Sequence, residues 1–304
     1  MSYNGTLFNR AYQLAMGPKG QDSGTFQYSN TGKTPSALRV AFEIDKNMQG
    51  NANTYKITIY NLSPSARDKI GQGWLLRLNA GYVNQIETLF LGNIDKAVSE
   101  RTGADIVTTL DVKDGGAAIS YASINKSYGN NVTLSQILSD VAKAMSLESA
   151  LSPDGIRPGI AQGLPDAVFA RGYVAHGTCR DVLTELLKPH GIEWNIQNGA
   201  LNLVPLQSST SSSAQLVSPS TGMIGIPTNN GKTIQFTSLL NPKLLPGTLV
   251  SIESKLTSLG GYYKIRDCKI SGDTHDKKWE VVAQCTRLTE NAVAKNTTST
   301  FEYP

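Results

Sequence analysis

A histidine between two carboxylates is the first arrangement in this sequence that could support chemistry. His275 lies between Asp273 and Asp276, and a neighbouring aspartate can orient an imidazole for general acid–base catalysis. However, the pair Gly272-Asp273 is typical of a turn, and the sequence identifies no partner nucleophile. We therefore interpret this segment as a structural turn.

Two histidines and a cysteine form a second candidate site, because imidazole nitrogen and thiolate sulfur are common ligands of metal ions. They are His176, Cys179 and His190. Cys179 falls in the apolar stripe of a predicted helix, and His190 follows the end of that helix, where a partly protonated imidazole is favourable. We therefore expect a core thiol and a helix-terminal histidine, with no metal ion, no cofactor and no catalytic residue.

The glycine-rich segments do not have the pattern of a phosphate-binding loop. Gly71-Gln72-Gly73 and Gly115-Gly116 are not followed by a Lys-Ser/Thr pair and do not open a βαβ unit, so we interpret both as turns. No paired-carboxylate motif for glycoside hydrolysis stands out, although such carboxylates need not be close in sequence. The sequence therefore predicts a protein that is not an enzyme.

The composition is typical of a β-rich protein with many turns. The 304 residues include 28 Gly and 13 Pro, and many Ser, Thr and Asn residues separate short apolar runs. The net charge is +4 and the Lys and Arg residues are scattered, which argues against a nucleic-acid-binding arm. The three cysteines are expected to be reduced. With no apolar run of roughly 20 residues and no signal-like N-terminus, we expect neither membrane insertion nor secretory export.

Residues 1–120 are predicted to form a first β-domain with an N-terminal arm. Apolar and polar residues alternate in several segments, which would place one set of side chains in a core and the other in solvent. A short helix is expected after the second strand, because Ser63 is a suitable N-cap and Pro64 suits the first helical position. The predicted strands are 39–45, 55–60, 74–80, 88–94 and 106–112.

Residues 121–206 are predicted to form an α+β insert that contains a degenerate repeat offset by 45 residues. Tyr128 and Thr133 of the first copy correspond to Tyr173 and Thr178 of the second. Each threonine precedes an amphipathic helix and can serve as its N-cap. The apolar positions that match are Leu134, Ile137, Leu138 and Val141 with Cys179, Val182, Leu183 and Leu186.

The remaining chain is predicted to form a hairpin, a linker and a second β-domain. Asn198-Gly199 is a strong turn signal and predicts a hairpin over 192–204. The Ser/Thr-rich residues 207–221 contain little to bury and are interpreted as a linker. Residues 222–290 are predicted to form the second β-domain and 291–304 a polar tail. The strands of the second β-domain are expected at 234–236, 249–253, 261–271 and 279–287.

Three stretches, in their order and spacing, resemble a known family. The first is 57–64, a strand that runs into a capped helix; the second runs from 224–227 to 239–247; the third is 270–275 with Trp279 close behind. Together they are similar to the baseplate hub proteins of contractile phage tails, the group that contains the late control protein D family. The implied fold is mainly β with an α+β insert: two tube-protein-like β-barrel domains plus a small helix-containing lobe.

The resemblance implies a structural protein of the virion tail baseplate that is made in the cytoplasm of the bacterial host. In such hubs a homotrimeric ring of six barrels adapts the sixfold tail tube to the threefold central spike. It leaves a channel through which double-stranded DNA passes without specific binding. The implied partners are the tail tube or tube-initiator protein and the central spike, with tape-measure and baseplate wedge proteins as further neighbours.

A tail-associated carbohydrate-binding or cell-wall-degrading protein is the alternative function. A carbohydrate-binding module is expected to expose aromatic platforms. Trp74, Trp194 and Trp279 instead fall within strand patterns, and we predict that they lie in the core. A non-contractile tail also stays open, because such tails contain hub-like barrels too.

Overall fold

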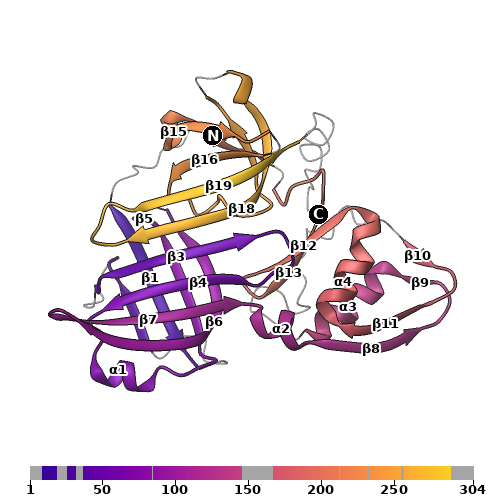
Figure 1. The fold of residues 1–304 in the computed structure, drawn as a ribbon, viewed down its shortest axis with the longest axis horizontal. Coiled ribbons are helices and arrows are strands. Elements are labelled where there is room, and N and C mark those ends of the chain that lie inside the picture. Colours follow the sequence, from indigo (N-terminus) through magenta and orange to yellow (C-terminus); the bar gives the residue numbers. More distant parts are fainter. Residues whose placement is uncertain are drawn as a thin grey trace, which may run out of the picture.

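The structure, a computed structural model, describes residues 9–18, 26–31, 37–83, 85–145, 167–211, 213–231, 233–254 and 257–288. The expected polar tail, 291–304, lies outside these ranges. Within them, a single large sheet contains most of the strands, and a smaller lobe with helices stands beside it (Figure 1). The predicted fold class, mainly β with a small helix-containing lobe, is confirmed.

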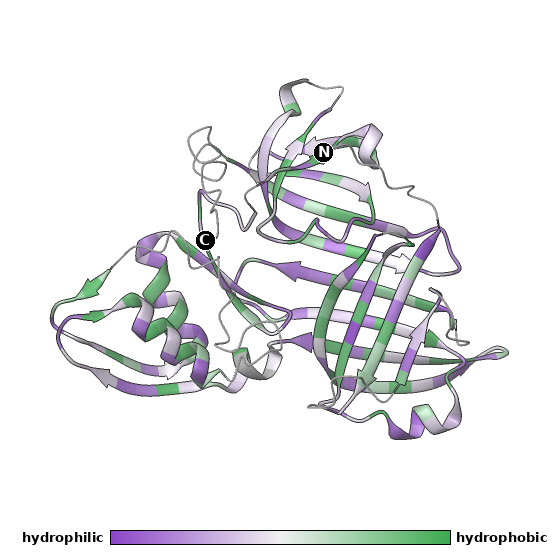
Figure 2. Ribbon diagram, turned by 180° about the vertical axis from the view of Figure 1, so that it is seen from behind, coloured by the Kyte–Doolittle hydropathy of each residue, from purple (hydrophilic) through white to green (hydrophobic). Residues whose placement is uncertain are grey.

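The first β-region contains seven strands in the antiparallel order β3-β4-β7-β6-β5-β1-β2. Buried and exposed residues alternate along β3 and β4, and the same alternation is visible as hydropathy in Figure 2. The five predicted strands are present, and β6 is far longer than expected. The strands are β1 (Arg10–Gly17), β2 (Phe26–Ser29), β3 (Val40–Asn47), β4 (Asn53–Tyr60), β5 (Leu75–Tyr82), β6 (Gln85–Thr102) and β7 (Asp105–Asp114).

Two local features of this region bear on the predictions. Helix α1 (Pro64–Lys69) begins as expected, since the Ser63 side chain accepts a hydrogen bond from the N–H of Ala66. Strand β1 was not among the predicted strands, and the expected N-terminal arm stays a prediction. Strand β1 lies inside the sheet between β5 and β2, because Tyr12, Leu14 and Met16 are apolar at alternate positions and bury one face.

The lobe is built from two copies of a strand–helix unit that pair with each other. Tyr128 lies opposite Tyr173, and the pairs Ser123–Thr178 and Thr133–Val168 lie equally far on either side. With the 45-residue offset these two pairs are equivalent to each other, as a local twofold axis through the Tyr128–Tyr173 pair requires. Its elements are α2 (Gly116–Tyr121), β8 (Ser123–Tyr128), β9 (Val132–Thr133), α3 (Leu134–Ala144), β10 (Val168–Phe169), β11 (Tyr173–Thr178), α4 (Cys179–Leu187) and η1 (Lys188–His190).

Both helices of the lobe begin at the predicted threonines. Thr133 accepts from the N–H of Gln136, which bonds back to form a capping box, and Thr178 accepts from the N–H of Asp181. The matching apolar stripes are buried in one core, as predicted. Among the described residues no helix is long and apolar enough to cross a membrane.

A hairpin of β12 (Ile192–Gln197) and β13 (Ala200–Pro205) follows the lobe. It turns at Asn198 and Gly199, which both have positive φ (55° and 75°), as a tight two-residue turn requires. Trp194 and Ile196 belong to the same apolar core as the helices. The hairpin predicted from Asn198-Gly199 is therefore confirmed.

The second β-region contains the remaining strands of the large sheet. The segment expected to be only a linker contributes to it, because Val217 is apolar, 2% exposed and lies in a strand that pairs in parallel with β17. The elements are β14 (Gln215–Val217), η2 (Pro219–Thr221), β15 (Met223–Asn229), β16 (Ile234–Leu239), β17 (Leu249–Ile252), η3 (Thr257–Leu259), β18 (Gly261–Asp273) and β19 (Trp279–Arg287).

Strand β18 joins the two β-regions into one sheet. Residues 267–273 of β18 pair antiparallel with 41–47 of β3, while the other edge of β18 pairs with β19. Figure 1 shows β3 and β18 side by side at the boundary. We call this boundary the seam. The backbone hydrogen bonds across the seam fix the two β-regions next to each other.

Candidate assembly site at the junction of the two β-regions

Two arginines of the first β-region hold the turn between β18 and β19. Arg10 donates hydrogen bonds to three of its carbonyl oxygens, those of Asp273 (3.1 Å), Asp276 and Lys277 (2.7 Å). Arg39 donates to the carboxylate of Asp273 at 3.3 and 2.8 Å, a bidentate geometry that is strong for an arginine–carboxylate pair. The turn therefore fastens the second β-region to the first.

The residues around His275 take a structural arrangement. The backbone N–H of His275 donates to Asp273 at 2.9 Å, and the exposed ring lies 2.9 Å from the Thr274 hydroxyl. Burial alone raises the pKa of Asp273, but the hydrogen bonds from Arg39 and from the His275 N–H outweigh it and hold this pKa below its ordinary value. An ionised Asp273 carboxylate can pair with the Arg39 guanidinium, and we call this ion pair the arginine clamp. The geometry around His275 therefore favours a structural role, as the sequence predicts.

A glycine lets two aromatic rings cover the seam. Gly272 lies opposite Phe42 on one side and opposite Trp279 on the other. The two rings meet edge to face with centroids 5.3 Å apart, a favourable geometry. A Cβ atom at Gly272 would lie 2.2 Å from the Phe42 ring. Position 272 therefore has to be glycine for the rings to pack in this way.

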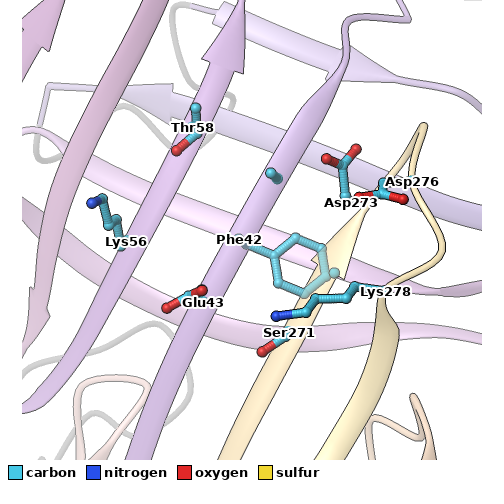
Figure 3. A pocket seen from close by; sticks show the side chains of 10 residues that line it. Phe42, Glu43, Lys56, Thr58, Ser271, Asp273, Asp276 and Lys278 are labelled. Atoms are coloured by element: carbon cyan, nitrogen blue, oxygen red, sulfur yellow. The ribbon is translucent and has the colours of Figure 1, made fainter.

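A hollow of about 260 Å³ opens at the seam (Figure 3). Glu43 and Lys56 reach it from β3 and β4, and Ser271 and Lys278 reach it from β18 and the following turn. Glu43 also pairs with Lys269 across the seam at 3.3 Å. Both side chains of that pair are about half exposed, so it adds little stability. The opposite charges of the lining compensate each other, which is typical of a solvated boundary.

The turn of the β12–β13 hairpin is anchored in the first β-region by a buried carboxylate. Asp114 accepts hydrogen bonds from the N–H groups of Asn198 and Gly199 (3.0 Å) and from the Tyr55 hydroxyl (3.2 Å). Burial raises the pKa of Asp114, while the charge of Lys46 and these hydrogen bonds oppose the rise. The three donors are the partners that a buried acceptor needs.

Three buried asparagines extend this anchor. Asn53 donates to the carbonyl oxygen of Ile196 at 2.7 Å, and Asn195 donates to that of Asn47 at 2.8 Å. Asn202 on β13 donates to Asn195 at 2.9 Å. Two of these side-chain amides thus bind backbone carbonyl groups, and the third binds the side chain of Asn195. The hairpin is held in one register against the end of β3 and the start of β4.

A buried lysine binds the hairpin to the second β-region. The Lys264 ammonium on β18 donates to Glu193 at 2.9 Å and to the carbonyl oxygens of Pro205 (3.2 Å) and Leu206 (2.8 Å). Burial lowers the pKa of Lys264, and the negative charge of Glu193 opposes this. Arg266 pairs with the other oxygen of Glu193 at 3.2 Å. The hairpin therefore contacts both β-regions and the lobe, and joins all three.

The residues considered as candidate metal ligands are not grouped into a site. His176 is exposed on β11, His190 is exposed in η1, and Cys179 is buried at the start of α4. Burial also raises the pKa of Cys179, which disfavours the thiolate that binds metals. Across the described ranges no group of three or more His, Cys, Asp or Glu residues is placed to hold a metal ion.

The three tryptophans pack against the protein. Trp279 and Trp194 are buried, and the Trp194 ring nitrogen donates to Thr184 at 3.2 Å. Trp74 is partly buried and stacks on Phe26 with centroids 6.2 Å apart. The tryptophan rings therefore lie in the apolar cores or pack against them, and they do not form an exposed aromatic platform.

Sequence reasoning missed most of the junction residues. Arg10 and Arg39 precede or begin strands and look like ordinary surface charges in the sequence. Asp114 stands before the Gly115-Gly116 pair, where a turn explains it equally well. A signal did exist at Lys264, because it interrupts an apolar strand between Tyr263 and Ile265. A charged residue in such a run indicates a buried partner.

Comparison with solved structures identifies the fold. The prophage MuSo2 43 kDa tail protein from Shewanella oneidensis has a TM-score of 0.58 at 14% identity, over 92% of this chain and 98% of that one. A tail protein from Neisseria meningitidis has a TM-score of 0.60 at 11% identity, over 95% and 99%. A type VI secretion component of E. coli, similar in structure to the T4 tail proteins gp27 and gp5, has a TM-score of 0.56 at 13% identity, over 86% and 76%. At these identities the likeness shows a shared fold.

Sequence comparison places the chain more specifically. No curated protein matches it by sequence. The pattern of one family, described as baseplate hub gp41, matches residues 23–285, which is most of the chain. The match spans the seam, the hairpin and the lobe. This protein belongs to the baseplate hub gp41 family of phage tail structural proteins.

Proposed function

We propose that this protein is the non-enzymatic hub of a phage tail baseplate. It forms a homotrimeric ring that adapts the sixfold tail tube to the threefold central spike. The observation that carries the proposal is the β3–β18 pairing. It fixes two β-regions of one chain side by side, as two neighbouring units of a ring would be.

The number of β-regions supplies the symmetry argument. Three chains with two β-regions each provide six units, which can face a sixfold tube. The two regions of a chain differ in sequence and in attached elements, since only one is followed by the lobe. The opposite face of the ring can therefore keep threefold symmetry. In this proposal both regions are tube-like barrels of similar shape, which superposition of their coordinates can test.

The proposed ring leaves a channel through which double-stranded DNA passes without specific binding. A continuous basic lining would hold the phosphates and slow the passage. The sequence has 28 Lys and Arg residues against 24 Asp and Glu. Several of the cations pair with carboxylates, among them Arg39, Lys113, Lys126, Lys264 and Lys269. Such pairing supports a channel without a dense positive surface.

The proposed partners are the tail tube or tube-initiator protein on one face and the central spike on the other. Tape-measure and baseplate wedge proteins are further neighbours, and the proposed location is the virion tail. The likeness to two tail proteins, one of them from a prophage, and to a type VI secretion component that is similar in structure to T4 tail proteins supports this placement.

Light scattering and electron microscopy of the purified chain test the proposal. The chain is measured alone and together with its tube and spike proteins. We expect a ring of three copies with a central channel, and a complex in which the ring joins tube to spike. A chain that stays monomeric and binds neither partner would refute the hub assignment.

A further inference from the structure

A groove opens where the lobe, the hairpin and the two β-regions meet. Its volume is about 240 Å³, and its lining comes from the turn after β3, from α4 and η1, from β12 and from β18. Figure 1 shows β12 and β13 between the lobe and the large sheet. The groove includes Met48 and Arg266, whereas the hollow of Figure 3 includes Phe42 and Gly272, at the other end of the seam. We call it the junction groove.

Part of the junction groove is apolar. Leu206, which lines it, is 50% exposed although it directly follows the largely buried strand β13. Ile192 and Trp194 also line the groove and are nearly buried, so only their edges can reach it. A concave surface with exposed apolar atoms is suited to bind an apolar side chain.

The rest of the groove has a surplus of positive charge. Lys188 and Arg266 line it, and Glu193 is the one carboxylate among the described residues of its lining. Glu193 already pairs with Arg266 and with the buried Lys264. No carboxylate of the described residues pairs with Lys188, and the buried Nε of Arg266 has no hydrogen-bond acceptor among them. Because a buried donor without an acceptor is costly, the groove is suited to receive a carboxylate.

One segment of this chain has the matching chemistry. Residues 289–304 lie outside the described ranges, and the first twelve of them are mostly Thr, Asn, Ser and Ala. They are followed by Phe301, Glu302 and Tyr303, which place an aromatic side chain on each side of a carboxylate. We call these three residues the aromatic motif. Its rings suit the apolar part of the junction groove, and its carboxylate suits the unpaired cations.

The groove lies within reach of the aromatic motif. The last described residue, Leu288, donates its N–H to the carbonyl oxygen of Tyr262 at 3.1 Å. Arg266 follows four residues later along β18, which corresponds to about 13 Å. The chain from Leu288 to Phe301 extends to roughly 40 Å and, as a flexible segment, spans roughly 20 Å on average. A motif tethered so close to the groove has a high effective concentration there.

We propose that the aromatic motif docks in the junction groove of its own chain. An aromatic ring of the motif packs on Leu206 and the edge of Trp194, and the Glu302 carboxylate accepts hydrogen bonds from Lys188 and Arg266. The docked segment contacts the lobe, the hairpin and both β-regions. It therefore fastens the lobe in one direction relative to the large sheet. This inference concerns a single chain and does not rest on the proposed ring.

Disulfide trapping in the full-length chain tests the docking. Gln49→Cys at the exposed rim of the groove is combined with Phe301→Cys, and the rate of disulfide formation with oxidised glutathione is measured; the natural cysteines are buried. Tyr262→Cys with Phe301→Cys is the matched control, because Tyr262 is 44% exposed and lies beside Leu288, closer to the start of the tail. An undocked tail would meet this control position at least as often. We expect the disulfide within one chain to form at least about tenfold faster with Gln49→Cys.

Two outcomes of the trapping would overturn the proposal. Equal rates for the two pairs, or a faster rate with Tyr262→Cys, would show that the tail does not dock in the groove. A disulfide that links two chains, at a rate that rises with protein concentration, would assign the groove to the tail of a second copy. Neither outcome depends on whether the chain assembles into a ring, so the hub proposal is tested separately.

Changes to the groove and to the motif test the proposed contacts. In the chain with Gln49→Cys and Phe301→Cys, Leu206→Asp removes apolar surface and repels Glu302, so it should slow trapping about tenfold. Val83→Asp, at a valine that is 56% exposed away from the groove, should leave the rate unchanged. Glu302→Gln should slow trapping about threefold, since it removes the charge but keeps an acceptor. All variants should keep the melting temperature of the reduced chain within about 2 °C. Trapping that ignores both Leu206→Asp and Glu302→Gln would overturn the proposal.

Discussion

The lobe and the junction of the β-regions are held together by different chemistry. In the lobe, two helices bury matching apolar stripes in one core. At the junction, Asp114, Lys264 and three asparagines bury polar groups that bind one another or the backbone. Apolar contacts stabilise without a fixed direction, whereas buried polar groups are satisfied in one arrangement only. The lobe is therefore built for stability, and the junction for a defined geometry between rigid units.

The largest effect is expected in the lobe. Leu183→Asp and Leu138→Asp each place a charge in a core without a partner, so each should lower the free energy of unfolding by about 4 kcal/mol. Chemical denaturation measures this change. Arg180→Asp on the exposed face of α4 is the control and should stay within about 0.5 kcal/mol of wild type. Near-wild-type stability in both leucine variants would show that the stripes do not form the core.

A smaller loss is expected when the junction loses its central acceptor. Asp114→Ala leaves the N–H groups of Asn198 and Gly199 without their acceptor and should cost about 3 kcal/mol. Asp114→Asn keeps one acceptor oxygen and should cost less. The ordering of the two variants in a denaturation experiment is the test. Equal losses would mean that the site needs the negative charge, not the acceptors.

The seam should be sensitive to a single methyl group. Gly272→Ala forces the Phe42 ring to move and should cost about 2 kcal/mol. Gly129→Ala is the control, because a Cβ there meets nothing within 4 Å. Phe42→Leu should make the alanine at position 272 less costly, and a double-mutant cycle measures this coupling. Additive effects of the two changes would contradict the observed contact.

The smallest effect concerns pH and the arginine clamp. Because the pKa of Asp273 is lower in the folded protein than its ordinary value, this carboxylate adds stability above about pH 4. That stability is lost as the pH falls through the lower, folded pKa. The melting temperature of wild type should therefore drop more steeply below about pH 4 than that of Asp273→Asn. Asp68→Asn, on the exposed face of α1, should behave as wild type, and identical curves for all three proteins would exclude the clamp as a source of acid sensitivity.

The elements that the sequence predicts well have local signals. Ser63-Pro64 starts α1, the two threonines cap the lobe helices and Asn198-Gly199 turns the hairpin, because each signal acts within a few residues of itself. Strand β1 was missed although it alternates, since an arm was expected there. Strands β8 and β11 were not predicted because each buries only one residue, so apolar and polar residues do not alternate clearly along them.

The candidate site was predicted only to a limited extent. A turn was expected at Gly272-Asp273, but these residues end strand β18 and the turn follows them. The partners of this turn, Arg10 and Arg39, lie more than 230 residues away in sequence. The β3–β18 pairing could not be predicted for the same reason. Nothing in the sequence of either strand indicates which distant strand will pair with its edge. The buried polar contacts of Asn53 and Asn195 depend on which backbone carbonyl groups the fold brings within reach. Only the folded backbone reveals this.

The distance between β3 and β18 along the chain also determines when the hub shape can arise. Residues 41–47 emerge from the ribosome early, and their partners 267–273 emerge only after the lobe and the hairpin have been made. Closing so long a loop is slow, and until then the outer edge of β3 is an unpaired strand that can recruit other chains. The intervening lobe, with its local contacts, can fold in the meantime. Production of this protein should therefore be most vulnerable to aggregation before the seam closes, and slower translation should increase that exposure.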